Sequence, residues 1–367
     1  FDIPSDTIEI PAPDSAPMAP PQQNMLLTLL PSGIMVVGTV VAGFLSSGNM
    51  ALLIPMMVMS LGMPMATIIA TQVQKKNYRK SVEQREKTYM QALEKQHAEL
   101  GILADKYRRT LELEYPRWAP LVEIATARGK NKRLWWRRSY DPDFLTLRLG
   151  TGGGTPSNKL VYSSDFDRKD PLLKHAQKLA DANRQAGDMP ILFSLKKVGS
   201  VVLSGRKPEH AYGLARKFIL ELAVHHSPED LSIALLADSP GAAERWGWLK
   251  WLPHTRSFNG QKRVRQLCFS TADTRPFMNF LSTEYAARAE KRKNARPGET
   301  FGASLVILLD DSGVLRQSQE ITALAAEGHE LGIHLIFVNQ NATPNTCRAR
   351  VELPEANAFR YLETFTV

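Results

Sequence analysis

The chain has 367 residues, which is enough for two or three structural units. Its two cysteines, Cys268 and Cys347, lie far apart and neither belongs to a CxxC pair. That pattern excludes a zinc ribbon and a disulfide framework, and it is typical of a reducing compartment. The formal net charge of +9 favours an anionic partner, so the positions of the basic residues must decide between nucleic acid and another acidic surface.

Residues 1–24 form a short N-terminal segment. Within it, Thr7–Ile10 reads TIEI, an alternation that predicts a strand at the edge of a sheet. The prolines that follow it predict an extended tether rather than a helix.

Residues 25–72 are predicted to form a transmembrane helical hairpin. No charged residue occurs between Ser15 and Gln74, and two apolar runs lie inside that interval, Met25–Leu45 and Met50–Thr71. Each run of about 20 residues is long enough to cross ~30 Å of hydrocarbon. The alternative is a buried helical hairpin of a soluble protein.

The basic residues after the second run predict the orientation of this hairpin. Lys75, Lys76, Arg79 and Lys80 follow it directly, which places that end in the cytoplasm. Because a two-pass hairpin returns the chain to the same side, we expect both termini to be cytoplasmic.

Residues 73–140 are predicted to form a helical stalk. Apolar residues recur at steps of three, four or seven, which predicts a long amphipathic helix that packs along one stripe. That stripe consists of Tyr78, Val82, Tyr89, Leu93, Leu100, Leu103, Tyr107 and Leu111. Tyr115-Pro116 is expected to end the helix.

A short second helix, over Leu121–Arg128, leads to the sequence KNKRLWWRR at 130–138. This basic and aromatic cluster has two interpretations. It could contact nucleic acid or lipid, or Trp135 and Trp136 could pack the stalk against the following domain while the charges face water. We favour packing.

Residues 141–367 are predicted to form an α/β domain. Short apolar runs alternate with helical patterns, and near-continuous apolar strands separated by helices indicate a mostly parallel sheet covered on both faces. The glycine-rich stretch at 150–159, between a strand at Phe144–Leu149 and the strand that resumes after it, has no GK[ST] in register. We interpret it as a hairpin connection rather than a phosphate loop.

The strand, loop and helix over Val201–Leu220 have the shape of a nucleotide-binding loop but not its chemistry. The candidate loop is Gly205, Arg206 and Lys207. Aligned on Gly205, the motif GxxxxGK[ST] requires Gly, Lys and Ser/Thr at the positions that His210, Ala211 and Tyr212 occupy. The lysine for the β/γ-phosphates and the hydroxyl for Mg²⁺ are therefore absent. The sequence predicts a degenerate, P-loop-NTPase-like ATPase domain that binds no cofactor.

Two further strands end in polar residues that match such a site. Asp310 and Asp311 follow the apolar run Ser304–Leu309, as the acidic residues of a Walker B strand do. Asn339 and Gln340 end the next core strand, at the sensor position of many motor ATPases. The alternative for the aspartates is capping of the turn that follows. With no metal ligand set and no catalytic residue assigned, a weak nucleotide-binding role for these residues stays a hypothesis.

Several stretches resemble the FtsK/SpoIIIE-type motor ATPase of type VII secretion systems, the EccC/EssC class. The sequences LWWRR and DPDFLTLRLG within Leu134–Gly150 are similar to the entry of that class into its first cytoplasmic domain. Trp248–His254, preceded by Leu236-Ala237-Asp238, is similar to its W-x-x-WLPH segment, and Gly332–Gln340 resembles the GIHL–ATQ strand of FtsK-like motors. The hairpin, the stalk and the failed phosphate loop agree with this class.

The resemblance implies a role in protein secretion at the bacterial cytoplasmic membrane. The segment would hold downstream ATPase domains at the secretion complex without being catalytic itself, and ATP and Mg²⁺ would act in those later domains. The implied partners are other membrane subunits, further copies of the chain (a hexamer in the assembled complex), and small secreted helical hairpins that bind the later domains.

Two other functions remain open at this point. The chain could be part of an FtsK-like DNA translocase, or it could pin a complex to the membrane without any motor. Because much of the basic excess lies at Lys75–Lys80 and Lys130–Arg138, close to the predicted membrane hairpin, acidic headgroups or partner subunits explain it more simply than DNA does. We therefore expect no nucleic-acid partner.

Overall fold

The computed structural model describes most of the chain. The described residues are 7–20, 25–45, 50–127, 131–154, 159–163, 167, 169–184, 186–259, 262–294, 302–310, 318–339 and 346–363. They fold as two compact units. The first unit comprises residues 1–107 and 155–186, and the second comprises 108–154 and 187–367.

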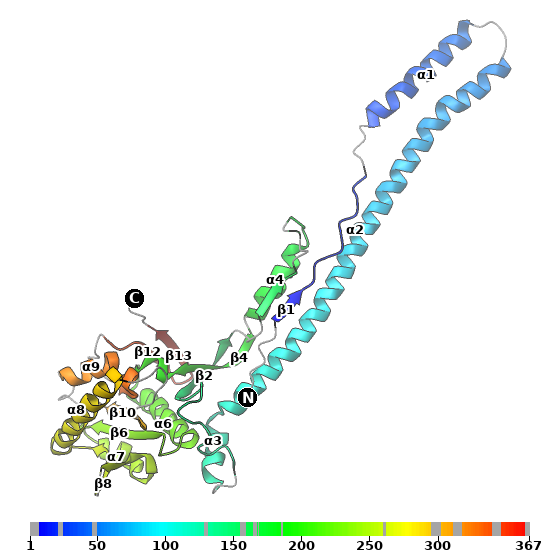
Figure 1. The fold of residues 1–367 in the computed structure, drawn as a ribbon. Helices are drawn as coiled ribbons and strands as arrows, with labels where there is room; N and C mark the ends of the chain where they lie inside the picture. Colours follow the sequence, from blue (N-terminus) through cyan, green and yellow to red (C-terminus); the bar gives the residue numbers. More distant parts are fainter. Residues whose placement is uncertain are drawn as a thin grey trace. The chain divides into compact units, whose positions relative to one another are not determined.

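The first unit is built on one long helix (Figure 1). Its elements are β1 (Thr7–Ile10), α1 (Met25–Leu45), the greater part of α2 (Met50–Glu114), β3 (Lys159–Tyr162) and α4 (Leu173–Arg184). β1 pairs in parallel with β3, with Thr7 opposite Lys159 and Ile10 opposite Tyr162. The predicted strand at Thr7–Ile10 is therefore confirmed, and its partner comes from more than 140 positions further along the chain by these numbers.

The apolar stripe of α2 is covered by the chain's own segments. Tyr89, Leu93 and Leu100 of α2 are buried in one cluster with Ile10 of β1 and with residues of α4. An ion pair between Arg85 and Asp170 lies beside this cluster, and the Tyr89 hydroxyl donates to the carbonyl oxygen of Pro11 at 3.2 Å. The predicted stripe is thus confirmed as a packing surface at these positions.

Helices α1 and α2 cover the two apolar runs that were predicted to span a membrane. In the described part of the chain, however, none of the helices combines the length and the hydropathy that crossing a bilayer requires. The interval between the two runs, residues 46–49, where the hairpin is predicted to turn, lies outside the described residues. The end of α2 at Glu114 confirms that Tyr115-Pro116 stops the helix.

The second unit is centred on a seven-stranded sheet of order β13-β12-β5-β11-β10-β6-β9. The strands are β5 (Ser200–Gly205), β6 (Leu231–Ala237), β9 (Leu267–Cys268), β10 (Ser304–Asp310), β11 (Ile333–Val338), β12 (Ala349–Glu355) and β13 (Ala358–Glu363). Every pair is parallel except the antiparallel β12–β13 hairpin. The predicted α/β architecture with a mostly parallel sheet is confirmed.

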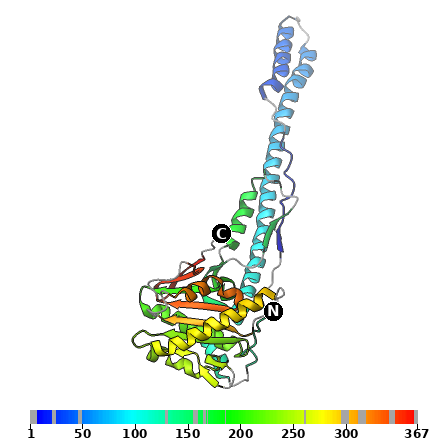
Figure 2. The ribbon, with the colours of Figure 1, turned by 60° about the vertical axis from the view of Figure 1, so that its left-hand side comes forward.

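Helices cover both faces of this sheet, as the unbroken apolar strands require (Figure 2, in which α8 is yellow). On one face, α6 (Pro208–His225) buries apolar side chains against Val201 and Leu203. On the other face, α8 (Thr271–Asn294) and α9 (Gln319–Glu327) pack against Val202 and other strand residues. Alternate residues of β5 thus point into different cores, as the period of a strand dictates.

Smaller elements complete the second unit. They are α3 (Trp118–Thr126), β2 (Thr146–Gly154), β4 (Ala186–Ser194, whose first residue lies in the first unit), α5 (Leu195–Val198), α7 (Ala242–Trp246), η1 (Gly247–Trp251), η2 (Pro253–Thr255), β7 (Arg256–Asn259), β8 (Lys262–Arg265) and η4 (Gly328–Leu331). β2 pairs with β4, and β7 with β8.

Several sequence-based boundaries need correction. The glycine-rich stretch does not connect a hairpin, because β2 runs on through Gly154 and pairs with β4, while β3 pairs with β1. The sequence pattern predicts helices over Leu214–Val224 and Pro276–Lys293. In the structure α6 begins at Pro208, and α8 begins at Thr271, so that Pro276 lies inside it. Glycine and proline mark the ends of helices and strands only on average. In the glycine-rich stretch, pairing of β2 with β4 outweighs the low strand propensity of glycine.

Candidate functional site

The Gly205–Lys207 loop joins the end of β5 to the start of α6, which is where a phosphate-binding loop would stand. Two backbone N–H groups at this turn already donate hydrogen bonds to carbonyls of the chain. The N–H of Arg206 donates to the carbonyl of Leu353 in β12 at 3.1 Å, and the N–H of His210 donates back to the carbonyl of Lys207 at 3.1 Å. A Cβ atom on Gly205 would come within 2.6 Å of the Lys207 carbonyl oxygen, so the tight turn itself requires glycine here.

Asp310 ends β10 at the same edge of the sheet, and its side chain is fully buried. One of its carboxylate oxygens, Oδ2, accepts a hydrogen bond from the Trp246 indole N–H at 2.6 Å and another from Nε of Arg245 at 3.2 Å. Both donors belong to the short helix α7, which follows β6. The neighbouring strand places Asp310 opposite Val338 of β11.

Tyr212 closes this cluster from α6. Its ring packs edge-on against Trp246 with 5.9 Å between ring centroids, and the guanidinium of Arg245 lies 4.3 Å from the centroid of the same ring. Burial, reinforced by the charge of Asp310, raises the pKa of the Tyr212 hydroxyl. Tyr212 therefore stays a neutral phenol beside the carboxylate.

Asn339 ties the loop to the end of β11. Its backbone N–H donates to the carbonyl of Leu203 at 2.9 Å, and its Nδ2 donates to the carbonyl of Pro208 at 2.9 Å. Its φ of 50° is in the left-handed region that asparagine tolerates better than most residues. Asn339 therefore fixes the start of α6, whereas Asp311 and Gln340 lie outside the described residues.

The donor set of this site differs from that of a Mg²⁺–triphosphate site. A Walker B aspartate needs access to a hydrated cation, and a phosphate loop needs free N–H donors, a lysine and a small hydroxyl. Here a guanidinium supplies the positive charge beside Asp310, and the Tyr212 ring stands where a small hydroxyl would be needed. Within the described ranges, no group of three or more acidic, histidine or cysteine side chains is arranged to hold a metal ion.

The comparisons with known proteins find sequence relatives of one class. No family model matches the chain. The ESX secretion system protein EccC of Geobacillus thermodenitrificans is 23% identical over 351 residues, which cover 93% of this chain and 22% of that protein. The type VII secretion system protein EssC of Staphylococcus aureus is 26% identical over 91% of this chain and 22% of its own length. The chain belongs to the EccC/EssC family of type VII secretion ATPases.

Other EccC proteins match parts of the chain. EccC of Thermomonospora curvata is 29% identical over 202 residues, 53% of this chain and 15% of that protein. Among solved structures, the cytoplasmic domain of the same T. curvata ATPase has a TM-score of 0.39 and 17% identity over 64% of this chain and 26% of that one. The chain thus spans about a fifth of the length of the EccC and EssC relatives that it matches along most of its own length.

The structure places together five of the seven residues that the sequence singled out in this EccC/EssC segment. Gly205, Arg206 and Lys207 form the loop, and Asp310 and Asn339 lie at the same carboxyl edge of the sheet, because β5, β11 and β10 are neighbours in it. Sequence reasoning missed Arg245 and Trp246. Because a buried carboxylate needs hydrogen-bond donors, a buried aspartate at the end of an apolar strand indicates that such donors exist. The sequence does not indicate which residues provide them.

Proposed function

We propose that this segment is a pseudo-ATPase and anchoring part of a type VII secretion motor, and that it couples downstream ATPase domains to the membrane complex. The observation that carries the proposal is the internal pairing of Asp310. Its Oδ2 accepts from both Arg245 and Trp246, and Tyr212 packs over these two residues. The side chains that would grip Mg²⁺ and a triphosphate are thereby replaced by contacts within the chain.

Membrane attachment is the second part of the proposal. The long uncharged interval from Ser15 to Gln74, followed by Lys75, Lys76 and Arg79, supports a two-pass hairpin in the bacterial cytoplasmic membrane with both termini in the cytoplasm. ATP and Mg²⁺ would then be used by downstream ATPase domains of the full-length protein, and not by this segment.

The proposed partners follow from family membership. They are other membrane subunits of the secretion complex and further copies of this chain, in a hexamer by family resemblance. A structure of T. curvata EccC contains ATPases 2 and 3 in complex with a signal sequence peptide. We propose that secreted substrates are likewise bound by downstream domains, while the present segment transmits their conformational state.

ATP turnover by the purified 367-residue chain in detergent tests the pseudo-ATPase part. We expect no Mg²⁺-dependent phosphate release above the buffer rate, and no change on Asp310→Asn, because nothing in the loop supplies the lysine that pairs the phosphates. Mg²⁺-dependent hydrolysis that disappears in the Asp310→Asn variant would overturn the proposal. A full-length family member with intact phosphate loops serves as the positive control for the assay.

An FtsK-like DNA translocase is the competing function, and the net charge of +9 is the observation that favours it. Binding to duplex DNA separates the two, because contacts to phosphates weaken steeply with salt, with a slope that counts them. We expect weak binding of a fluorescent duplex at 50 mM salt and none at 200 mM. Tight binding at 200 mM salt would favour the translocase.

A further inference from the structure

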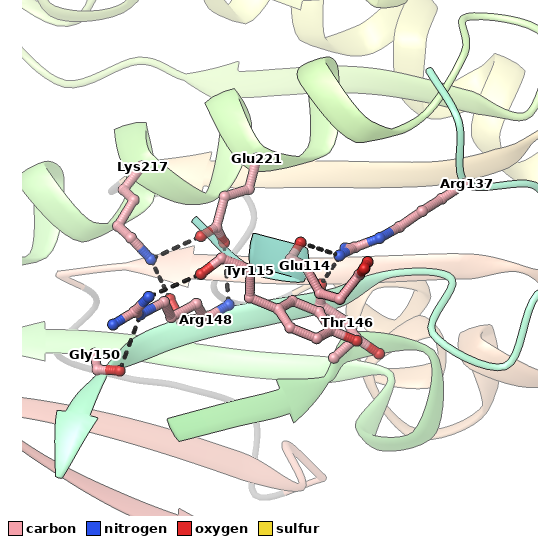
Figure 3. Close-up of polar contacts among 8 residues, drawn as sticks. All are labelled: Glu114, Tyr115, Arg137, Thr146, Arg148, Gly150, Lys217 and Glu221. Atoms are coloured by element: carbon pink, nitrogen blue, oxygen red, sulfur yellow. Dashed lines mark hydrogen bonds and ion pairs between the residues drawn. The ribbon is translucent and has the colours of Figure 1, made fainter. Parts of the chain in front are cut away.

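Within the second unit, two buried arginines, Arg137 and Arg148, contact the C-terminal end of α2, and we call this pair the arginine clamp (Figure 3). The last carbonyls of any helix lack partners within the helix. Here Nη2 of Arg137 donates to the Glu114 carbonyl at 2.8 Å, and Nη1 of Arg148 donates to the Tyr115 carbonyl at 2.8 Å. The clamp therefore satisfies the end of α2 with side chains from two later points in the chain.

Both clamp arginines are 2% exposed, so their charges must be compensated inside the protein. The negative end of the α2 dipole provides part of this compensation. Asp143 lies 2.8 Å from Nε of Arg137, and Glu112 lies 3.8 Å from Nη2 of Arg148. The Arg137 guanidinium also lies 4.4 Å from the centroid of the Tyr115 ring. These contacts compensate the charges of both buried arginines, so removing either arginine would leave carboxylates or helix-end carbonyls without a partner.

Arg148 is hydrogen-bonded to residues of α6 as well as to the end of α2. Its backbone N–H donates to Oε2 of Glu221 at 3.1 Å, and its carbonyl accepts a hydrogen bond from Nζ of Lys217. Lys217 and Glu221 are joined at 2.9 Å one turn apart on α6, and Glu221 is 3% exposed. Burial is the main cause that raises the pKa of Glu221 and lowers that of Lys217. One residue of β2 thus contacts the end of one helix and the middle of another.

The same helix α6 carries the candidate site near its start. Tyr212 packs against Arg245 and Trp246, and Lys217 and Glu221 follow it within three helical turns by their numbers. Most residues of α6 from Ala211 to His225 are buried, and a close-packed interior has low compressibility and transmits strain. A displacement of α6 at Glu221 should therefore also shift Tyr212.

We propose that the arginine clamp is a conformational coupling device, which links the last turn of α2 to α6 and through α6 to the Asp310 cluster. The last turn of α2 cannot leave its position without breaking buried charged hydrogen bonds or displacing α6 with it. The inference goes beyond the proposed function, because it holds whether or not nucleotide binds at the Gly205 loop.

Hydrogen–deuterium exchange of the full chain tests the coupling in the variant Arg137→Met/Arg148→Met. We expect exchange at least about tenfold faster both in residues 108–127 and in residues 208–222, since charged buried hydrogen bonds are lost. Strand β11, which contributes no residue to the Asp310 cluster, should keep its protection. The matched control is Arg138→Met, which removes an exposed arginine that pairs with Asp230 at 3.2 Å outside both segments, and it should change neither segment.

Three outcomes would overturn the proposal: unchanged exchange, faster exchange in residues 108–127 alone, or an equal acceleration in β11. If the double variant does not fold, Arg148→Lys is judged by the same criteria, because lysine keeps the charge but lacks the planar guanidinium that donates to the carbonyls of Tyr115 and Gly150 together. Glu221→Gln, which weakens the α6 side of the contact alone, should accelerate residues 108–127 as well as 208–222.

Discussion

At the scale of single residues, the contact between Asp310 and Arg245 decides the chemistry of the candidate site. A fully buried carboxylate must be matched by donors or by a cation. Arg245, with a side chain 20% exposed, provides the charge, and Trp246 provides a neutral N–H. Oδ2 of Asp310 is therefore satisfied from within the chain, whereas its Oδ1 is buried with no hydrogen-bond partner among the described residues.

A double-mutant cycle tests this pairing. Arg245→Met should lower the free energy of unfolding by about 2 kcal/mol, because it leaves a buried carboxylate with one donor fewer. In an Asp310→Asn background the same change should cost at least about 1 kcal/mol less, since the charge has gone. Urea unfolding followed by tryptophan fluorescence reports on the second unit, which contains all six tryptophans. Additive effects of the two changes would contradict the pairing.

A second prediction at this scale concerns His226. Its Nδ1 lies 3.0 Å from the Leu222 carbonyl, and its Nε2 accepts the N–H of Leu145 at 3.1 Å, so a protonated ring would place a donor against a donor. Burial, with the nearby Arg137 charge, lowers the pKa of His226 to about 3. The unfolded chain, with a histidine pKa of about 6.5, binds this proton more readily than the folded chain.

The sign of the pH dependence follows. This histidine has no effect on stability above about pH 6.5, and below it the free energy of unfolding falls by about 1.4 kcal/mol per pH unit until pH ~3. His226→Gln should reduce that slope by about this amount between pH 6 and 4, in urea unfolding series at each pH. The exposed His97→Gln variant is the control, and an unchanged slope in His226→Gln would refute the assignment.

At the scale of elements, β1 is held by partners that are remote in sequence. Ile10 is fully buried in the cluster formed with α2 and α4, and β3 is its only strand partner in the described part of the chain. A two-stranded ribbon is marginal by itself in water. Burial of Ile10 beneath the α2 stripe is therefore the main stabilising contact of this ribbon.

Replacing Ile10 should separate the ribbon from α2. We expect Ile10→Ala to lower the stability of the first unit by about 2–4 kcal/mol through the cavity that it leaves. The neighbouring exposed Glu9→Ala should have an effect within about 0.5 kcal/mol. Limited proteolysis between residues 11 and 20 measures release of the segment. Equal cleavage rates in the two variants would show that Ile10 does not anchor it.

At the scale of the whole molecule, the question is whether the chain is attached to a membrane through the two apolar runs. Carbonate extraction of bacterial membranes that contain the chain separates integral from peripheral proteins. We expect the wild-type chain to stay in the pellet. Val37→Arg/Val41→Arg should move it toward the soluble fraction, since each arginine near the middle of a span costs about 2.5–3.5 kcal/mol.

The matched control for this experiment is Val37→Leu/Val41→Leu, which keeps the run apolar and should stay in the pellet. Full extraction of the wild-type chain by carbonate would contradict the anchoring proposal. The result would leave the pseudo-ATPase proposal intact, because that rests on the Asp310 cluster alone.

Much of the fold could be predicted from local pattern. The apolar run Ser304–Leu309 was identified as a strand and forms β10, Ser304–Asp310, because a fully buried strand is apolar at nearly every position. The β7–β8 and β12–β13 hairpins were missed, since their residues are mixed in polarity and their pairing partners, not their own propensities, stabilise them. The loop at Gly205 and the strand end at Asp310 were also predicted, because each directly follows an apolar strand.

The sequence by itself determined the α/β class, the long helix that stops at Tyr115-Pro116, and the absence of a lysine and a small hydroxyl from the phosphate loop. These are local facts of residue type and spacing. Only the tertiary structure decided that Arg245 and Trp246 donate to Oδ2 of Asp310, that β1 pairs with β3, and that Arg137 and Arg148 donate to the carbonyls at the end of α2. Those contacts join residues 23 to about 150 positions apart, and the partner of a buried polar group is selected by three-dimensional proximity, for which sequence spacing carries no signal.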